Sequence, residues 1–295
     1  MLTAQVQKFI ASHPDYTPLA EVIEKEIMHH DVMAVLVSHG VMNQLTFIGG
    51  TSLRMCYNSS RLSEDLDFNA GHSFKPSDFA GLEDELQRFL EHKYELPVWV
   101  NRPSEVAQGD TSSWTISIEK QANRPDLPRQ KIHIDVCAIP SFDVQRRPLV
   151  NHYSMVVPTE GLLVPVQSLE ETLADKFIAL AYRARRIKPR DLWDIMWIRQ
   201  RGTNLVGQLV NQKLTARQKT HDDFVAMLSV QLQKLQSDPS VRRDFVDEMS
   251  RFVPVQLHQR TVENVAYWSY LQQEITTLSQ QLSKDSQTQS PFDMS

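Results

Sequence analysis

The fold of this chain is built around one stretch, Leu45-Thr46-Phe47-Ile48-Gly49-Gly50-Thr51-Ser52-Leu53. Residues 45–48 form a short apolar run that favours β-structure, and the two glycines follow directly. This order predicts a strand that ends where a helix begins. Thr51 or Ser52 is expected to cap that helix through its hydroxyl group.

A junction of this kind is suited to bind a phosphate group. Gly49 and Gly50 let the backbone approach a polyanion closely, and the N–H groups of the first helical turn point toward it. Thr51 or Ser52 would add a hydroxyl donor. The alternative is a pair of turn glycines with no ligand, because such short patterns recur by chance.

A second segment, Arg61-Leu62-Ser63-Glu64-Asp65-Leu66-Asp67-Phe68, places two carboxylates two residues apart. On a strand, Asp65 and Asp67 project from the same face, and Leu66 and Phe68 project into the core. Two carboxylates on one face repel each other unless a cation lies between them, and Mg²⁺ is usually bound by one or two carboxylates plus substrate phosphates. The alternative is an exposed acidic pair at a strand edge.

Composition limits the classes of protein that fit. With 295 residues the chain can form one large domain or two modest ones, and a net charge of −5 argues against a globally basic nucleic-acid binder. No apolar stretch approaches the roughly 20 residues of a membrane span, and the N-terminus lacks the features of a secretory signal, so we expect a cytoplasmic protein without a membrane partner. Cys56 and Cys137 are expected to be buried free thiols.

The N-terminal half reads as a mixture of helices and strands. Helices are predicted over 18–38 and 76–92, and strands over 94–100, 112–119 and 131–138. The cluster His29-His30-Asp31 is expected to be solvated, since adjacent helical histidines point in different directions and make a poor metal site. In residues 131–137 the alternation places Asp135 on the face opposite the apolar residues, which alone indicates an edge or a solvated face.

The C-terminal part is predicted to be helical. Ser168 with Glu171 forms a plausible capping box for a helix that reaches about residue 187. Lys176 and Arg183 share a face of it, seven residues apart. Four further helices are expected over 204–214, 222–236, 239–252 and 256–282, and residues 283–295 are polar enough to be disordered.

Another helix is expected to open at residues 190–195, where Asp191 and Asp194 lie at i and i+3 and so share a face. Taken alone, Lys176 reads as a solvated helix lysine and Asp191 as a favourable first-turn carboxylate. Between Arg183 and Arg201 the sequence has seven basic and two acidic residues. This local excess of positive charge is where a polyanionic acceptor would be expected.

Together, the Gly-Gly-Thr and Arg-x-Ser-x-Asp-Leu-Asp-Phe segments closely resemble the AbiEii/AbiGii-type toxins, nucleotidyltransferases of toxin–antitoxin and phage-defence systems. The resemblance extends from about Phe47 to Trp197. It implies an α+β protein: a polymerase-β-like nucleotidyltransferase domain with a small mixed sheet (1–165), then a helical domain that closes the nucleotide cleft (166–282), and a disordered tail (283–295).

The resemblance also implies roles for individual residues. Asp65, Asp67 and Asp135 would bind Mg²⁺ or Mn²⁺. Binding of the NTP is implied for the segment 49–52 with Ser63, Lys176 and Arg190. Lys176, Asp191 and Asp194 would complete the catalytic set. The residues expected to bind nucleotide are, in full, Gly49, Gly50, Thr51, Ser52, Ser63, Lys176 and Arg190.

The implied enzyme transfers a nucleoside monophosphate from an NTP to an acceptor hydroxyl. The resemblance suggests RNA as the acceptor, above all the 3′ end of tRNA, with growth arrest as the result and an antitoxin as partner. One alternative is nucleotidylation of a protein hydroxyl. Another is a catalytically inert nucleotide-binding protein, which the full set of acidic residues argues against.

Overall fold

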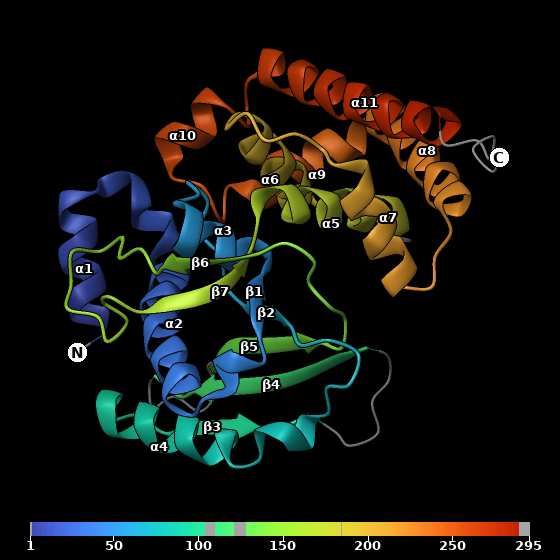
Figure 1. The fold of residues 1–295 in the computed structure, drawn as a ribbon. Coiled ribbons are helices and arrows are strands. Elements are labelled where there is room, and N and C mark those ends of the chain that lie inside the picture. Colours follow the sequence, from blue (N-terminus) through green and yellow to red (C-terminus); the bar gives the residue numbers. More distant parts are fainter. Residues whose placement is uncertain (1, 104–109, 121–127, 184, 289–295) are drawn as a thin grey trace. The chain divides into compact units, whose positions relative to one another are not determined.

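The structure is a computed structural model that describes residues 2–103, 110–120, 128–183 and 185–288. The chain divides into two compact units, residues 1–167 and 168–295. The first unit contains a mixed sheet with helices, and the second unit is helical where it is described (Figure 1). The predicted α+β class is therefore confirmed.

The elements of the first unit follow one another from the N-terminus to residue 167. Its helices and 3₁₀ turns are α1 (Leu2–Ser12), η1 (Pro14–Leu19), α2 (Ala20–Ser38), η2 (Val41–Asn43), α3 (Gly49–Tyr57), η3 (Pro76–Phe79) and α4 (Leu82–Tyr94). Its strands are β1 (Thr46–Ile48), β2 (Leu66–Asn69), β3 (Val98–Asn101), β4 (Thr111–Ile118), β5 (Gln130–Cys137), β6 (Val144–Pro148) and β7 (Leu163–Gln167).

In the described part of the chain the strands form one sheet of seven, in the order β3-β4-β5-β2-β1-β7-β6 (Figure 1). β2 runs parallel to β5, and β1 runs parallel to β7, while the other neighbouring pairs are antiparallel. The register pairs Leu66 with Ile134 and Phe68 with Val136, all of them buried. Because side chains alternate along a strand, Asp67 and Asp135 lie on the opposite face.

Several predictions for the first unit need correction. Gly81 adopts a positive φ of 85° and separates η3 from α4, so the predicted helix over 76–92 is broken. The strand expected from residue 94 begins at Val98, because Tyr94 ends α4. Strand β6 was not predicted: it lies at the sheet edge and its residues are mostly exposed and polar, which removes the alternating pattern.

In its described residues, the regular secondary-structure elements of the second unit are all helices. They are α5 (Leu169–Tyr182), α6 (Pro189–Arg199), α7 (Gly207–Ala216), α8 (His221–Ser237), α9 (Pro239–Met249), α10 (Val255–Arg260) and α11 (Val265–Thr288). Helix α5 packs against α6, α7 and α8, and its buried residues Leu173 and Phe177 form part of the core. This arrangement follows from the helical spacing of the apolar residues.

Caps set the start of α5, as the sequence predicts. The Ser168 side chain accepts a hydrogen bond from the Glu171 backbone N–H at 3.0 Å. The predicted helix over 256–282 is instead two helices, α10 and α11. α11 continues through Thr288, so residues 283–288 are helical rather than disordered. Residues 289–295 lie outside the described residues.

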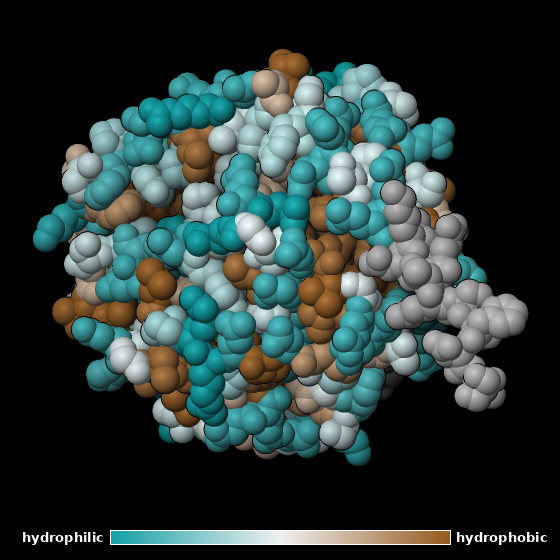
Figure 2. Space-filling model, turned by 45° about the horizontal axis from the view of Figure 1, so that its top comes forward, coloured by the Kyte–Doolittle hydropathy of each residue, from teal (hydrophilic) through white to brown (hydrophobic). Residues whose placement is uncertain are grey.

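The surface is mostly hydrophilic on the face drawn in Figure 2, where hydrophobic side chains form separate groups between polar ones. Exposed hydrophobic residues include Val144, Val156 and Leu163. Scattered apolar residues of this kind are normal for a folded protein. Across the described helices, none combines the length and the apolar character that a membrane crossing requires.

Candidate active site

The junction between β1 and α3 brings the glycines against two polar side chains. Gly49 has a positive φ of 76°, and a Cβ placed on it would lie 2.5 Å from Oδ2 of Asp67. A Cβ placed on Gly50 would lie 2.1 Å from Nη2 of Arg61. Any side chain at either position would therefore displace a charged group of the site.

The two hydroxyls after the glycines have a different role from the one predicted. Helix α3 begins at Gly49 with no side-chain cap, so the predicted cap by Thr51 or Ser52 is wrong. Both residues lie inside the first helical turns and are fully buried. The Thr51 hydroxyl lies 2.8 Å from Oγ of Ser63 and also contacts the backbone oxygen of Asp65, and Ser52 donates to the Gly49 carbonyl at 2.9 Å. Thr51 thus ties α3 to the acidic segment, whereas the Ser52 bond stays within α3.

Two of the three carboxylates predicted from the sequence lie on neighbouring strands, and the third lies just before one of them. Asp67 of β2 is in register with Asp135 of β5, on strands that lie about 4.8 Å apart in a sheet. Asp65, just before β2, accepts a hydrogen bond at its Oδ1 from the backbone N–H of His133 at 3.2 Å. All three aspartates are half-buried. The topology thus unites residues almost 70 positions apart in the sequence.

The donor set suits a hard divalent cation. Within the described residues, no group of three or more His, Cys, Asp or Glu side chains is arranged to enclose a metal ion by itself. Mg²⁺, however, is usually bound through one or two carboxylates and the phosphates of a substrate, with water at the remaining positions. The in-register pair of Asp67 and Asp135, with the glycine backbone against Asp67, fits that mode of binding.

The second group of predicted site residues lies on α5 and α6. The Nζ of Lys176 is 2.8 Å from Oδ1 of Asp191 and 2.8 Å from Oδ2 of Asp194. Arg183 reaches the other oxygen of Asp191 at 2.8 Å. The shared faces expected from the i, i+3 and i, i+7 spacings are therefore present.

The electrostatics of this cluster keep Asp191 ionised. Burial alone would raise the pKa of Asp191, but the adjacent charges of Lys176 and Arg183 outweigh it and hold that pKa well below its usual range. Asp194 is fully buried, and Lys176 keeps 13% of its side chain exposed. The two carboxylates thus fix the position of the ammonium group of a side chain that is partly exposed.

The basic segment 183–201 is more neutral than its sequence suggests. Arg186 and Arg190 both pair with Glu248, at 2.7 and 3.3 Å, and Arg199 pairs with Glu274 at 2.8 Å. These acids lie on α9 and α11, far away in the sequence, so a local charge count misses them. Arg190, expected to bind nucleotide, also stacks over the Phe252 ring with its guanidinium 4.6 Å from the centroid.

The cluster His29-His30-Asp31 is buried, so its predicted solvation is wrong. Helix α2 lies within the unit, and all three residues are at most 2% exposed. His30 bonds Thr159 at 2.5 Å, and Asp31 pairs with Lys93 and Tyr94. Apolar residues on every side of α2 indicate a buried helix, but they do not identify the distant partners that make the burial of these polar residues possible.

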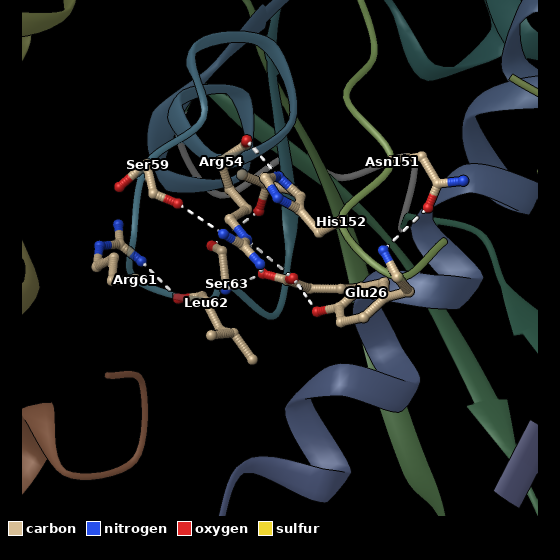
Figure 3. A network of polar contacts seen from close by, with 10 residues as sticks. Glu26, Arg54, Ser59, Arg61, Leu62, Ser63, Asn151 and His152 are labelled. Atoms are coloured by element: carbon tan, nitrogen blue, oxygen red, sulfur yellow. Dashed lines mark hydrogen bonds and ion pairs between the residues drawn. The ribbon is translucent and has the colours of Figure 1, made fainter. Parts of the chain in front are cut away.

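Sequence reasoning also missed a buried network beside the acidic segment (Figure 3). Glu26 of α2 pairs with Arg54 of α3 at 3.0 Å and accepts the backbone N–H of Ser63 at 2.9 Å. Tyr153 donates its hydroxyl hydrogen to the same carboxylate. No short motif joins these residues, because they come from three distant parts of the chain.

A cavity of about 630 Å³ lies elsewhere in the first unit. It is lined by Phe74, Phe79, Trp114 and Arg102, among others. Trp114 is in register with Ile134, which places this cavity on the apolar face of the sheet. Among the residues that the structure describes, none of the predicted site residues lines it.

Comparison with known proteins connects this geometry to a family. The sequence matches the family described as "Nucleotidyl transferase AbiEii toxin, Type IV TA system" over residues 31–271. This chain belongs to the AbiEii nucleotidyltransferase toxin family. The match includes every residue that the sequence predicted for the site, and it begins within α2, after Glu26 and His29.

The fold of this AbiEii-family chain is also similar to that of a solved toxin structure. MenT4, a nucleotidyltransferase toxin from Mycobacterium tuberculosis H37Rv, is similar with a TM-score of 0.57 at 18% identity, over 97% of this chain and 92% of that one. JHP933 from Helicobacter pylori gives a TM-score of 0.47 at 15% identity, over 90% and 99% of the two chains. A search of curated protein sequences finds no match.

Proposed function

We propose that this AbiEii-family protein transfers a nucleoside monophosphate from an NTP to a hydroxyl group at the 3′ end of tRNA, which arrests growth unless an antitoxin intervenes. The observation that carries the proposal is the in-register pair of Asp67 and Asp135, with Gly49 packed against Asp67. Membership of the family supports the reaction type and the existence of an antitoxin.

The acidic residues would act on the acceptor and on the α-phosphate. Asp65, Asp67 and Asp135 would hold Mg²⁺ or Mn²⁺, which when bound would stabilise charge on the attacking and leaving oxygens. Asp135 would take the proton of the acceptor hydroxyl. The acceptor oxygen then bonds to the α-phosphorus, the bond from that phosphorus to the bridging oxygen breaks, and pyrophosphate leaves with the electron pair.

The remaining residues would bind and orient the NTP. The backbone N–H groups of Gly49, Gly50 and Thr51, at the start of α3, would face the phosphates. Because the hydroxyls of Thr51 and Ser52 are already bonded within the protein, we assign the phosphate contacts to the backbone. Lys176, held by Asp191 and Asp194, would neutralise charge on the leaving pyrophosphate.

A labelling experiment tests this function. The protein is incubated with Mg²⁺ and each α-labelled NTP in turn, with total RNA in one reaction and lysate protein in another. We expect label on the 3′ end of RNA of tRNA size, no label in the presence of a chelator, and no label with Asp67→Ala at an unchanged melting temperature. Label in protein alone would move the assignment to protein nucleotidylation, and no label in either fraction would contradict transferase activity.

A further inference from the structure

The chain approaches the candidate carboxylates without regular secondary structure. Strand β2 begins only at Leu66, so the backbone groups of Ser63, Glu64 and Asp65 lack the hydrogen-bond ladder that fixes a strand. Ser63 is buried, and buried backbone groups need partners. Something other than the sheet must therefore determine the course of the segment Ser63–Asp65.

Helix α2 supplies partners for this segment from one side. The Glu26 carboxylate accepts the backbone N–H of Ser63 at 2.9 Å. Nε2 of His29 lies 3.0 Å from the backbone oxygen of Glu64. Lys25 pairs with the Glu64 side chain at 2.8 Å. Three residues within two turns of one helix thus contact two consecutive residues that precede Asp65.

Glu26 is held as a charged acceptor. It is 2% exposed. Burial would raise its pKa, but Arg54 and the Tyr153 hydroxyl outweigh that effect and lower the pKa below its usual range. Figure 3 shows the carboxylate between the Arg54 guanidinium and the Ser63 backbone. Because Arg54 and Tyr153 already fix this buried carboxylate, the position at which it accepts the Ser63 N–H is fixed as well.

The tautomer of His29 follows from its hydrogen-bond partner, and its charge follows from its burial. A carbonyl oxygen can only accept, so Nε2 carries the hydrogen and donates it to Glu64. Nδ1 is buried and finds no hydrogen-bond partner among the described residues. Burial lowers the pKa of His29, which keeps the ring neutral. The one hydrogen bond that it donates is to the segment before the carboxylates.

We propose that Glu26 and His29 are positioning residues, which hold the segment Ser63–Asp65 so that Asp65 and Asp67 meet the cation and the NTP correctly. Thr51 contacts the Asp65 backbone oxygen from α3, so the segment is held between two helices. The inference rests on the function proposed above. Neither Glu26 nor His29 lies in the family match over residues 31–271.

Variants at two adjacent positions of α2 separate positioning from stability. His29→Leu removes the donor to Glu64, and His29→Gln offers an amide N–H in its place. His30→Leu is the matched control, because His30 is equally buried and bonds Thr159 instead of the acidic segment. Binding of Mn²⁺ in the presence of each NTP is measured by electron paramagnetic resonance, together with kcat and KM.

We expect His29→Leu to weaken Mn²⁺ binding about tenfold or more, as is typical when an outer partner of a metal ligand is lost. His29→Gln should recover most of the affinity, and His30→Leu should bind as the wild type does. Equal weakening in His29→Leu and His30→Leu, or no recovery in His29→Gln, would overturn the inference.

The proposed function can be wrong independently of the positioning role of Glu26 and His29. If the wild type binds Mn²⁺ with NTP but transfers no nucleotide, the function is wrong while the His29 series still decides the positioning role. If the wild type binds no Mn²⁺, both are wrong. Glu26→Asp gives a second measurement, since it keeps the charge that Arg54 needs but shortens the reach to Ser63. We expect the same weakening there, and unchanged binding would remove Glu26 from the proposal.

Discussion

Both the local backbone conformation and the geometry of the site constrain Gly49. Its positive φ of 76° costs roughly 1–2 kcal/mol for any residue with a Cβ. A Cβ there would also lie 2.5 Å from Oδ2 of Asp67, far inside van der Waals contact. Two separate constraints, one local and one from β2, therefore require glycine at this position.

Gly49→Ala should reduce nucleotide transfer by about 100-fold or more, because displacing a catalytic group by about 1 Å can cost that much. Gly71→Ala is the matched control: its φ is 81°, but nothing lies within 4 Å of the added Cβ. Both variants should lose stability in a urea titration because of the positive φ, and Gly49→Ala should lose more because of its contact with Asp67. Equal activity losses in the two would show that backbone strain alone, and not the contact with Asp67, explains the need for glycine.

At the scale of elements, α2 shows what sequence patterns can and cannot reveal. The helix itself was predictable, since apolar residues recur along 18–38. The burial of His29 and His30 was not, because their partners Glu64 and Thr159 are 35 and 129 residues away. The same limit applies to the site: the spacing of Asp65 and Asp67 predicted a shared face, but only the parallel pairing of β2 with β5 places Asp135 in register with Asp67.

The burial of histidines in α2 predicts acid sensitivity. Burial, with smaller effects from His29, His152 and Lys93, lowers the pKa of His30 to about 4. An unfolded histidine has a pKa of about 6.5, so the unfolded chain binds a proton first and folding stability falls as the pH drops from 6.5 toward 4. Below that range both states are protonated and this contribution stays constant.

We expect His30 to account for a loss of about 2 kcal/mol in unfolding free energy between pH 7 and pH 5. Unfolding in urea is measured at both pH values, with pulsed hydrogen exchange of α2 peptides as the readout. His30→Leu should show a smaller pH dependence by about that amount, while the remaining loss comes from other groups. An identical pH dependence in the two proteins would mean that His30 is already accessible to protons in the folded state.

At the scale of the whole molecule, the distribution of charge bears on the acceptor. The protein has a net charge of −5, and much of its basic segment 183–201 is paired with acids of the same unit. Arg185 and Arg186 are exposed, with Arg186 paired to Glu248. If RNA binds here, these two arginines are where phosphate contacts should be sought.

The double variant Arg185→Glu/Arg186→Glu should therefore weaken acceptor binding far more than NTP binding. Each phosphate contact that is lost should flatten the log–log salt dependence of acceptor affinity by roughly 0.7–0.9, because fewer counterions are released. The control Lys8→Glu/Arg88→Glu changes the net charge by the same amount at exposed residues of α1 and α4. Acceptor affinity is measured from low to moderate salt for all three proteins.

The slope of the log–log salt dependence, more than the affinity itself, decides between an RNA acceptor and a protein acceptor. General repulsion of RNA by added negative charge would weaken both double variants alike, whereas lost contacts flatten the slope only for Arg185→Glu/Arg186→Glu. A small protein acceptor has no comparable reason to show a steep slope in the wild type. Acceptor binding that hardly changes with salt, or that is equal in the wild type and the Arg185→Glu/Arg186→Glu protein, would exclude the basic segment from RNA binding and favour protein nucleotidylation.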